Sequence, residues 1–149
     1  MVNIDFKEEV VPFWEWLRDK RIKNKIKTRE FLLISLLILY GQPLNRILNL
    51  KISDISLNLK LIWFNGGKVK DGYPIKKKLL PYLEYYIPFC ELSEKGLLFV
   101  MTRRWADKIL LKQSKEYFNK PIRAGMFIRS IKDYSNKLYL KPDNLEILK

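Results

Sequence analysis

The sequence contains no histidine and only one cysteine, Cys90. A single cysteine excludes an internal disulfide and a cysteine-rich metal site, and the absence of histidine removes the commonest metal ligand and general base. Zinc chemistry is therefore excluded on composition, and we expect neither a metal site nor a cofactor.

Long apolar runs are also missing. The most apolar run, Phe31 to Tyr40, is about half of the roughly 20 residues that a membrane-spanning helix requires, so it is expected to form a buried core helix. The N-terminus carries Asp5, Glu8 and Glu9 and lacks the apolar stretch that is typical of a signal peptide. These features predict an intracellular, cytoplasmic protein with no membrane partner.

Acidic residues are scarce relative to basic ones: 16 Asp and Glu stand against 29 Lys and Arg, a net charge of +13. Such an excess is typical of proteins that bind a polyanion, most often nucleic acid and sometimes an anionic membrane or an acidic protein surface. A lysine-rich surface that serves only solubility is the alternative. With 149 residues, 48% of them hydrophobic, the chain is expected to form a single domain, in which residues 1–27 are an N-terminal helix and basic linker and residues 28–149 are the main core.

The most informative stretch runs from Phe31 to Lys77. Its apolar run ends at Gly41, which suits the left-handed residue that closes a helix, and Pro43 suits the first position of a following short helix. Three strands of a small sheet are predicted next, at residues 59–64, around 68–69 and around 73–75, with turns between them. The order of parts is therefore helix, sharp corner, short helix and antiparallel sheet.

The flanking segments have helical patterns. Residues 5–17 predict a short or kinked amphipathic helix interrupted by Pro12, and Thr28 is expected to cap the central helix, which would begin at Arg29 or Glu30. Further helices are predicted over residues 79–89, from Thr102 to about Phe118, and between Pro121 and Pro142.

In these parts the chain resembles the catalytic domain of the tyrosine recombinases, the phage-integrase family. In that family a glycine corner is followed by a helix of the form R-x-S-E-x-x-x-L, an aspartate, and a small sheet that carries a lysine. The residues that match are Gly41, Leu48, Leu50, Asp54, Gly67, Lys68, Pro74 and Ile75. The resemblance implies an α+β, mainly α fold, with an integrase-like helical core over residues 28–149 and a small three-stranded antiparallel sheet.

The residues that perform the family's reaction match only in part. That reaction is attack of a tyrosine on a DNA phosphodiester, with two arginines and a lysine neutralising the transition state and a histidine helping to move protons. The first arginine is replaced here by Pro43 and the histidine by Met126, whereas Arg129 and Lys68 stand in the places of the second arginine and the lysine. Arg46, one turn after Pro43, is a candidate substitute for the missing arginine.

The nucleophilic tyrosine has no match. In the family it follows the second arginine by two further helices, whereas only twenty residues follow Arg129 here, and Tyr134 and Tyr139 fall within the same predicted helix. The resemblance therefore implies a DNA-binding protein that is not an enzyme, a regulator of recombination or transcription. It would have no catalytic residues, with Arg46, Lys68 and Arg129 as residual candidates.

Several basic residues are candidates for contacts with duplex DNA. Arg103 and Arg104 open a helix, where the terminal N–H groups and the helix dipole add to the side-chain charge. The basic run from Arg18 to Arg29 either lies along a phosphate backbone or is a solvated loop. Phosphate contacts carry little sequence information, so binding is expected to be largely nonspecific and steeply salt-dependent. The predicted DNA-binding residues are Lys68, Lys70, Arg103, Arg104, Arg123 and Arg129.

Two other interpretations stay open. The chain could be a fragment of an active recombinase whose tyrosine is supplied from elsewhere. It could instead be a protein-interaction module that binds a recombinase or self-associates. Exposure of Trp14, Trp16 and Trp63 would favour the module, because clustered surface aromatics mark interfaces.

Overall fold

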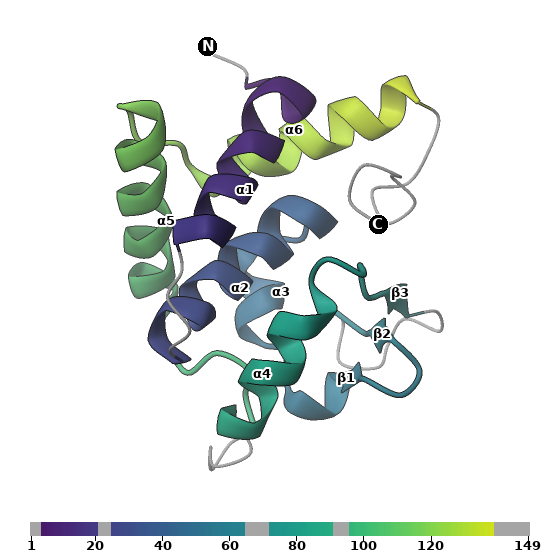
Figure 1. Ribbon diagram of the computed structural model, residues 1–149. Coiled ribbons are helices and arrows are strands. Elements are labelled where there is room, and N and C mark those ends of the chain that lie inside the picture. Colours follow the sequence, from purple (N-terminus) through teal and green to yellow (C-terminus); the bar gives the residue numbers. More distant parts are fainter. Residues whose placement is uncertain (1–3, 21–24, 65–71, 91–95, 139–149) are drawn as a thin grey trace.

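The computed structural model describes residues 4–20, 25–64, 72–90 and 96–138. The chain is mainly helical, with one small sheet at the side of the helical core (Figure 1). The elements in chain order are the π-helical turn η1 (Phe6–Val10), α1 (Val11–Lys20), α2 (Lys25–Tyr40), α3 (Leu44–Leu48), the 3₁₀ turn η2 (Ile52–Asp54), β1 (Ile55–Ser56), β2 (Leu61–Ile62), β3 (Tyr73–Pro74), α4 (Leu80–Cys90), α5 (Arg103–Phe118) and α6 (Ala124–Lys137).

Helix α2 is the centre of the core, as its apolar run predicts. Every residue from Phe31 to Tyr40 is buried, because α1, α3, α4, α5 and α6 pack around the helix and leave it no solvent-facing side in this run. The helix begins at Lys25, so the prediction that Thr28 caps it is wrong. Thr28 lies inside α2, and its buried hydroxyl has no hydrogen-bond partner among the described residues. No helix in the described part of the chain is both long and apolar enough to cross a bilayer.

The N-terminal helix docks on α2 through aromatic side chains. It is interrupted as expected: η1 gives way to α1 at Val11, and Pro12 lies in the first turn of α1. The buried indole of Trp14 donates to the hydroxyl of Ser35 on α2 at 2.9 Å. The ring of Phe13 stacks 5.5 Å from that of Phe127, which joins α1 to α6.

The corner and the sheet follow α2. Gly41 has φ of 64°, which confirms the predicted left-handed corner, while Pro43 is the N-cap of α3 rather than its first residue. The sheet is antiparallel with strand order β1-β2-β3, which confirms three strands. Its members differ in part from the predicted ones: β1 was not predicted, β2 and β3 lie within the first and third predicted strands, and the strand expected around residues 68–69 lies outside the described residues.

The C-terminal helices agree with their sequence signals. Thr102 caps α5 by accepting from the N–H of Trp105 at 3.1 Å, and Asn119 ends the helix in a left-handed conformation. Helix α6 ends at Lys137, earlier than the predicted end at Pro142.

Candidate nucleic-acid interface

The start of α5 is held by contacts with the segments that precede it. The hydroxyl of Tyr86 on α4 donates to the carbonyl of Leu98 at 3.0 Å, and the N–H of Leu98 donates to the carbonyl of Leu50 at 2.9 Å. Burial, and then the neighbouring Cys90, raises the pKa of Tyr86 far above its ordinary value of 10.0. The neutral phenol is therefore a stable anchor for the extended segment that leads into α5.

Arg103 and Arg104 lie exposed in the first turn of α5, as predicted for a pair at a helix start. The guanidinium of Arg103 donates to the side-chain oxygen of Asn45 on α3 at 2.7 Å and lies 3.5 Å from the carboxylate of Asp107. Arg104 forms no hydrogen bond or ion pair with any residue that the structure describes. One arginine is therefore oriented by its neighbours, and the other is available to a ligand.

Arg46 lies beside this pair, on the short helix that α5 contacts. It follows Asn45, the residue that Arg103 binds, and its own guanidinium donates to the buried Gln42 at 3.2 Å. The structure therefore brings Arg46 together with the start of α5, although the two are nearly sixty residues apart in sequence.

Helix α6 carries Arg129 and packs against the corner that precedes Arg46. Phe127 and Ile131 are buried, and Arg129 between them is exposed, because residues two apart on a helix lie on different faces. A Cβ atom on Gly41 would lie 3.0 Å from the Cγ2 atom of Ile131, so the corner that leads to Arg46 rests directly on α6. We call the exposed arginines of these three elements, Arg46, Arg103, Arg104 and Arg129, the cationic face.

Arg123 does not join the start of α5. It is the exposed N-cap residue of α6, beyond the C-terminal end of α5, and α5 has 16 residues. At a rise of about 1.5 Å per residue, the 16 residues of α5 put roughly 24 Å between its two ends. Lys68 and Lys70 lie outside the described residues. Among the predicted DNA-binding residues in the described part of the chain, Arg103 and Arg104 therefore lie together, and Arg123 lies well apart from them.

The positions that differ from the recombinase pattern are structurally ordinary. Pro43 is exposed at the cap of α3, and Met126 is partly buried against the core. Tyr134 lies on α6 as expected, with its ring 5.3 Å from that of Phe6, while Tyr139 lies outside the described residues.

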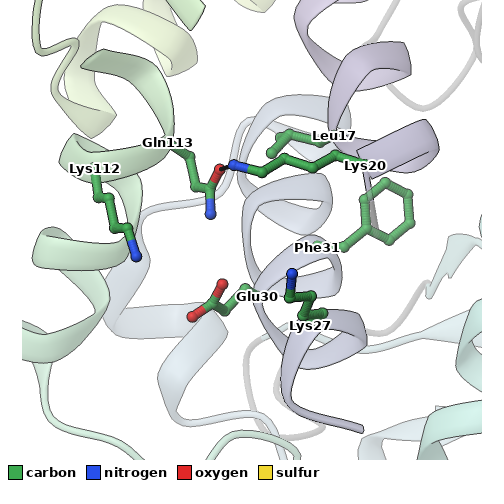
Figure 2. Close-up of a pocket in the computed structure, with 7 residues that line it drawn as sticks. All are labelled: Leu17, Lys20, Lys27, Glu30, Phe31, Lys112 and Gln113. Carbon is green, nitrogen blue, oxygen red and sulfur yellow. Dashed lines mark hydrogen bonds between the residues drawn. The ribbon is translucent and has the colours of Figure 1, made fainter. Parts of the chain in front are cut away.

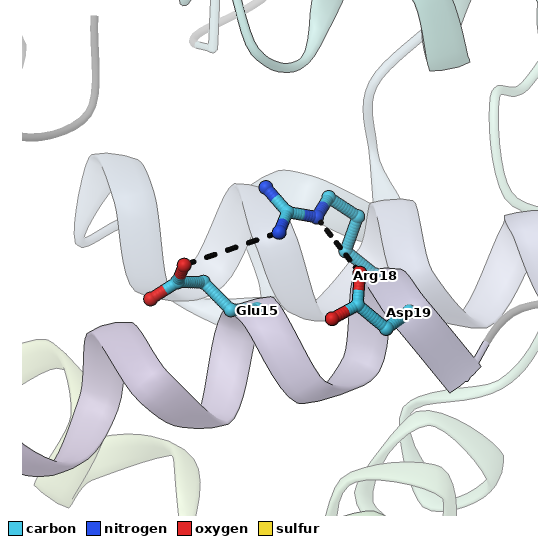
Figure 3. Close-up of polar contacts among 3 residues, drawn as sticks. All are labelled: Glu15, Arg18 and Asp19. Atoms are coloured by element: carbon cyan, nitrogen blue, oxygen red, sulfur yellow. Dashed lines mark hydrogen bonds and ion pairs between the residues drawn. The ribbon is translucent and has the colours of Figure 1, made fainter.

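The basic run from Arg18 to Arg29 is largely helical where the structure describes it, rather than a loop. It comprises the end of α1 and the start of α2. Arg18 lies between two acids, 3.9 Å from Glu15 and 3.3 Å from Asp19 (Figure 3), and stacks over the ring of Trp14. Arg18 is thus already engaged by its own helix.

Sequence reasoning missed the exposed aromatic residue of the site. Trp105, in the first turn of α5, has 51% of its surface exposed, whereas Trp14 is buried and Trp16 and Trp63 are only partly exposed. The exposure of Trp14, Trp16 and Trp63 that would have favoured a protein-interaction module is therefore not found. The buried residues of α5 recur at helical spacing from Ala106, and on a helical wheel Trp105 lies about 100° from the centre of that stripe.

The central buried helix, the glycine corner and the small antiparallel sheet give this chain a tyrosine-recombinase-like fold. A crystal structure of the XerH site-specific recombinase bound to difH substrate, a pre-cleavage complex, matches it with a TM-score of 0.71 and 21% identity, over 93% of this chain and 44% of that one. A post-cleavage complex of XerH with palindromic difH matches with a TM-score of 0.69 and 20% identity, over 92% of this chain and 42% of that one. The chain therefore spans less than half the length of these recombinase chains.

No family model matches the sequence, and a search of curated proteins found no match. The prediction that the protein is not an enzyme is nevertheless contradicted, because the solved structures that share its fold are of a site-specific recombinase, before and after cleavage. Missing motif residues at Pro43 and Met126 were too narrow a basis for that prediction, since other side chains can supply charge at such a site.

Proposed function

We propose that this chain is a DNA-binding domain of a recombinase-related protein, and that its cationic face contacts the phosphate backbone of duplex DNA. The main support is the grouping of Arg46, Arg103 and Arg104 where α3 packs against the start of α5. The solved structures with this fold are complexes with their DNA substrates, which favours DNA over other polyanions.

The arrangement suits phosphate on physical grounds. A guanidinium presents a planar set of donors that matches two phosphate oxygens, and it keeps its charge at every physiological pH. At the start of α5 the unpaired N–H groups and the helix dipole add further positive potential beside Arg103 and Arg104. Arg129 and Arg123 would extend the contact along α6, and Lys68 and Lys70 are kept as proposed contacts from the sequence.

A salt titration tests this function. Binding of a labelled duplex would be measured by fluorescence anisotropy at two salt concentrations, for the unaltered chain and for a double variant, Arg46→Ala with Arg104→Ala. Each lost phosphate contact lowers the slope of log affinity against log salt by about 0.9, so the double variant should lose roughly 2 units of slope.

The control is Lys115→Ala, which removes one positive charge, against two in the double variant, from the exposed surface of α5, eleven residues beyond Arg104 and so about 16 Å along the helix. It should leave both the affinity and the slope nearly unchanged. Binding that ignores salt, or an equal loss in the control, would reject the cationic face as the DNA contact.

Strand cleavage is the second candidate function, favoured because the solved structures with this fold include a pre-cleavage and a post-cleavage complex. Arg46 and Arg129 would then stabilise charge on the scissile phosphate, with Lys68 assisting. A nicked suicide substrate would trap a covalent protein–DNA adduct, seen on a denaturing gel, and mass spectrometry would identify the attached tyrosine. Absence of any adduct, with the chain alone and with an active recombinase added as tyrosine donor, would reject this candidate.

A further inference from the structure

A separate basic pocket lies between α1, α2 and α5. Its volume is about 200 Å³, and Figure 2 shows the side chains that line it. The lining residues are Leu17, Lys20, Lys27, Glu30, Phe31, Lys112 and Gln113. Three lysines from three different helices therefore share one cavity, and none of them belongs to the cationic face.

One lysine is held in place by partners on α5. The ammonium group of Lys20 donates to the side-chain oxygen of Gln113 at 3.0 Å and lies 2.6 Å from a carboxylate oxygen of Glu116. Because Gln113 is buried and its oxygen is engaged by Lys20, its amide N–H groups are the donors that it can offer to a ligand (Figure 2).

The charges of the three lysines all act on the carboxylate of Glu116. The hydrogen bond from Lys20 holds the pKa of Glu116 below its ordinary value, and the charges of Lys20, Lys112 and Lys27 act in the same direction. Glu116 is thus an anion that the cluster already attracts at its rim. Glu30 lines the pocket between Lys27 and Lys112 (Figure 2), so three positive charges face two negative ones and the site has an excess of positive charge.

We propose that this pocket binds a phosphate group, held by Lys20, Lys27, Lys112 and the amide of Gln113, and that Glu116 competes with the ligand for Lys20. The cavity has room for a tetrahedral anion, since a water molecule occupies only about 30 Å³ of liquid. The apolar side chains of Leu17 and Phe31 line the same cavity, on the side of α1 and α2.

The same chemistry is offered by free inorganic phosphate and by a phosphodiester of a nucleic acid. This inference does not rest on the proposed function, because the pocket and the cationic face share no residue. The experiment therefore uses both ligands in turn.

Inorganic phosphate would be titrated into the full chain while ¹H–¹⁵N NMR spectra are recorded, with sodium chloride at matched ionic strength as the reference. Amide signals around Lys27 and Gln113 should shift saturably with phosphate and not with chloride. Glu116→Gln should strengthen phosphate binding roughly fivefold, because it removes one competing charge while nearly preserving the shape of the side chain. Lys20→Ala combined with Lys112→Ala should abolish the saturable shift, and Lys115→Ala should leave it unchanged.

A short duplex is then added at a fixed phosphate concentration. If duplex displaces phosphate from these signals, the ligand is the nucleic-acid backbone, and if it does not, the ligand is a free phosphate; either result supports the site. Two results would overturn it: equal shifts with phosphate and chloride, or a Glu116→Gln variant whose phosphate affinity is not raised. Because Glu116 is exposed, this variant keeps the test valid even if the double lysine variant fails to fold.

Discussion

The cationic face and the packing beneath it differ in burial: the arginines are exposed, and the residues beneath them are buried. Beneath, a Cβ atom added at Gly41 would lie only 3.0 Å from Ile131, and the neighbouring side chains are buried. Above, the arginines are exposed, and Arg104 has no partner among the described residues. Changes beneath should therefore alter stability first, whereas changes above should alter affinity and leave stability almost intact.

The largest effect is expected from Ile131→Ala. Ile131 is fully buried where α6 meets the corner, and truncating such a side chain typically costs about 2–5 kcal/mol of unfolding free energy. Urea denaturation would measure the loss. The exposed neighbour Lys132→Ala should change stability by no more than about 0.5 kcal/mol. Equal stabilities of the two variants would show that the corner is not tightly packed.

Gly41→Ala should have the next largest effect. Both Gly41 and Gly96 have φ of 64°, but an added Cβ would lie 3.0 Å from Ile131 at position 41 and meets no atom within 4 Å at position 96. Gly96→Ala should cost only the conformational term, about 1–2 kcal/mol, and Gly41→Ala should cost that amount plus the steric contact. Denaturation of both variants gives the difference directly, and a difference of zero would contradict tight packing at the corner.

Tyr86→Phe should cost about 1 kcal/mol, because it removes the hydrogen bond to the carbonyl of Leu98. The folded-state pKa of Tyr86 is raised by burial, so its contribution to stability is complete below its ordinary pKa of 10.0 and is lost as the pH rises above that value. The denaturation midpoint should therefore drop between pH 8 and a pH above 10, and this drop should be smaller for Tyr86→Phe than for the unaltered chain. An identical fall in both would remove Tyr86 as the cause.

The smallest effect is expected at Arg103, where two substitutions distinguish the role of its charge from that of its planar guanidinium in DNA binding. Arg103→Lys keeps the positive charge and loses the planar guanidinium, so the salt dependence of DNA binding should be unchanged while affinity falls roughly threefold. Arg103→Ala should reduce the salt slope as well. Anisotropy titrations at two salt concentrations distinguish these results, and neither variant should shift the denaturation midpoint appreciably.

Much of the fold could be predicted because the relevant signals are local. An apolar run without a polar face requires burial, which places α2 at the centre, and Gly41 and Thr102 act through their own backbone conformation or hydrogen bond. The strand β1 could not be predicted in the same way, because two residues show no alternation. Thr28 was misassigned because a good capping residue is also tolerated inside a helix.

The candidate site was less predictable, because it depends on distances across the fold. The sequence indicates that Arg103 and Arg104 open a helix, but not that Arg103 reaches Asn45 or that Arg123 lies at the other end of α5. The pocket between α1, α2 and α5 joins Lys20 and Lys27 to Lys112, which is 85 or more residues away in the chain. Only the packing of the helices could bring these charges together.

The contact between Trp14 and Ser35 has a consequence for how the N-terminal helix fits the rest of the protein. In the buried run from Phe31 to Tyr40, the polar side chains are Ser35 and the phenol of Tyr40 at its end. The hydroxyl of Ser35 accepts a hydrogen bond from the indole N–H of Trp14. Sliding or rotating α1 by one residue would strand that N–H in a dry environment, at a cost of about 1–3 kcal/mol. The hydroxyl of Ser35 therefore fixes the register of α1 on α2, which apolar contacts alone would leave undetermined.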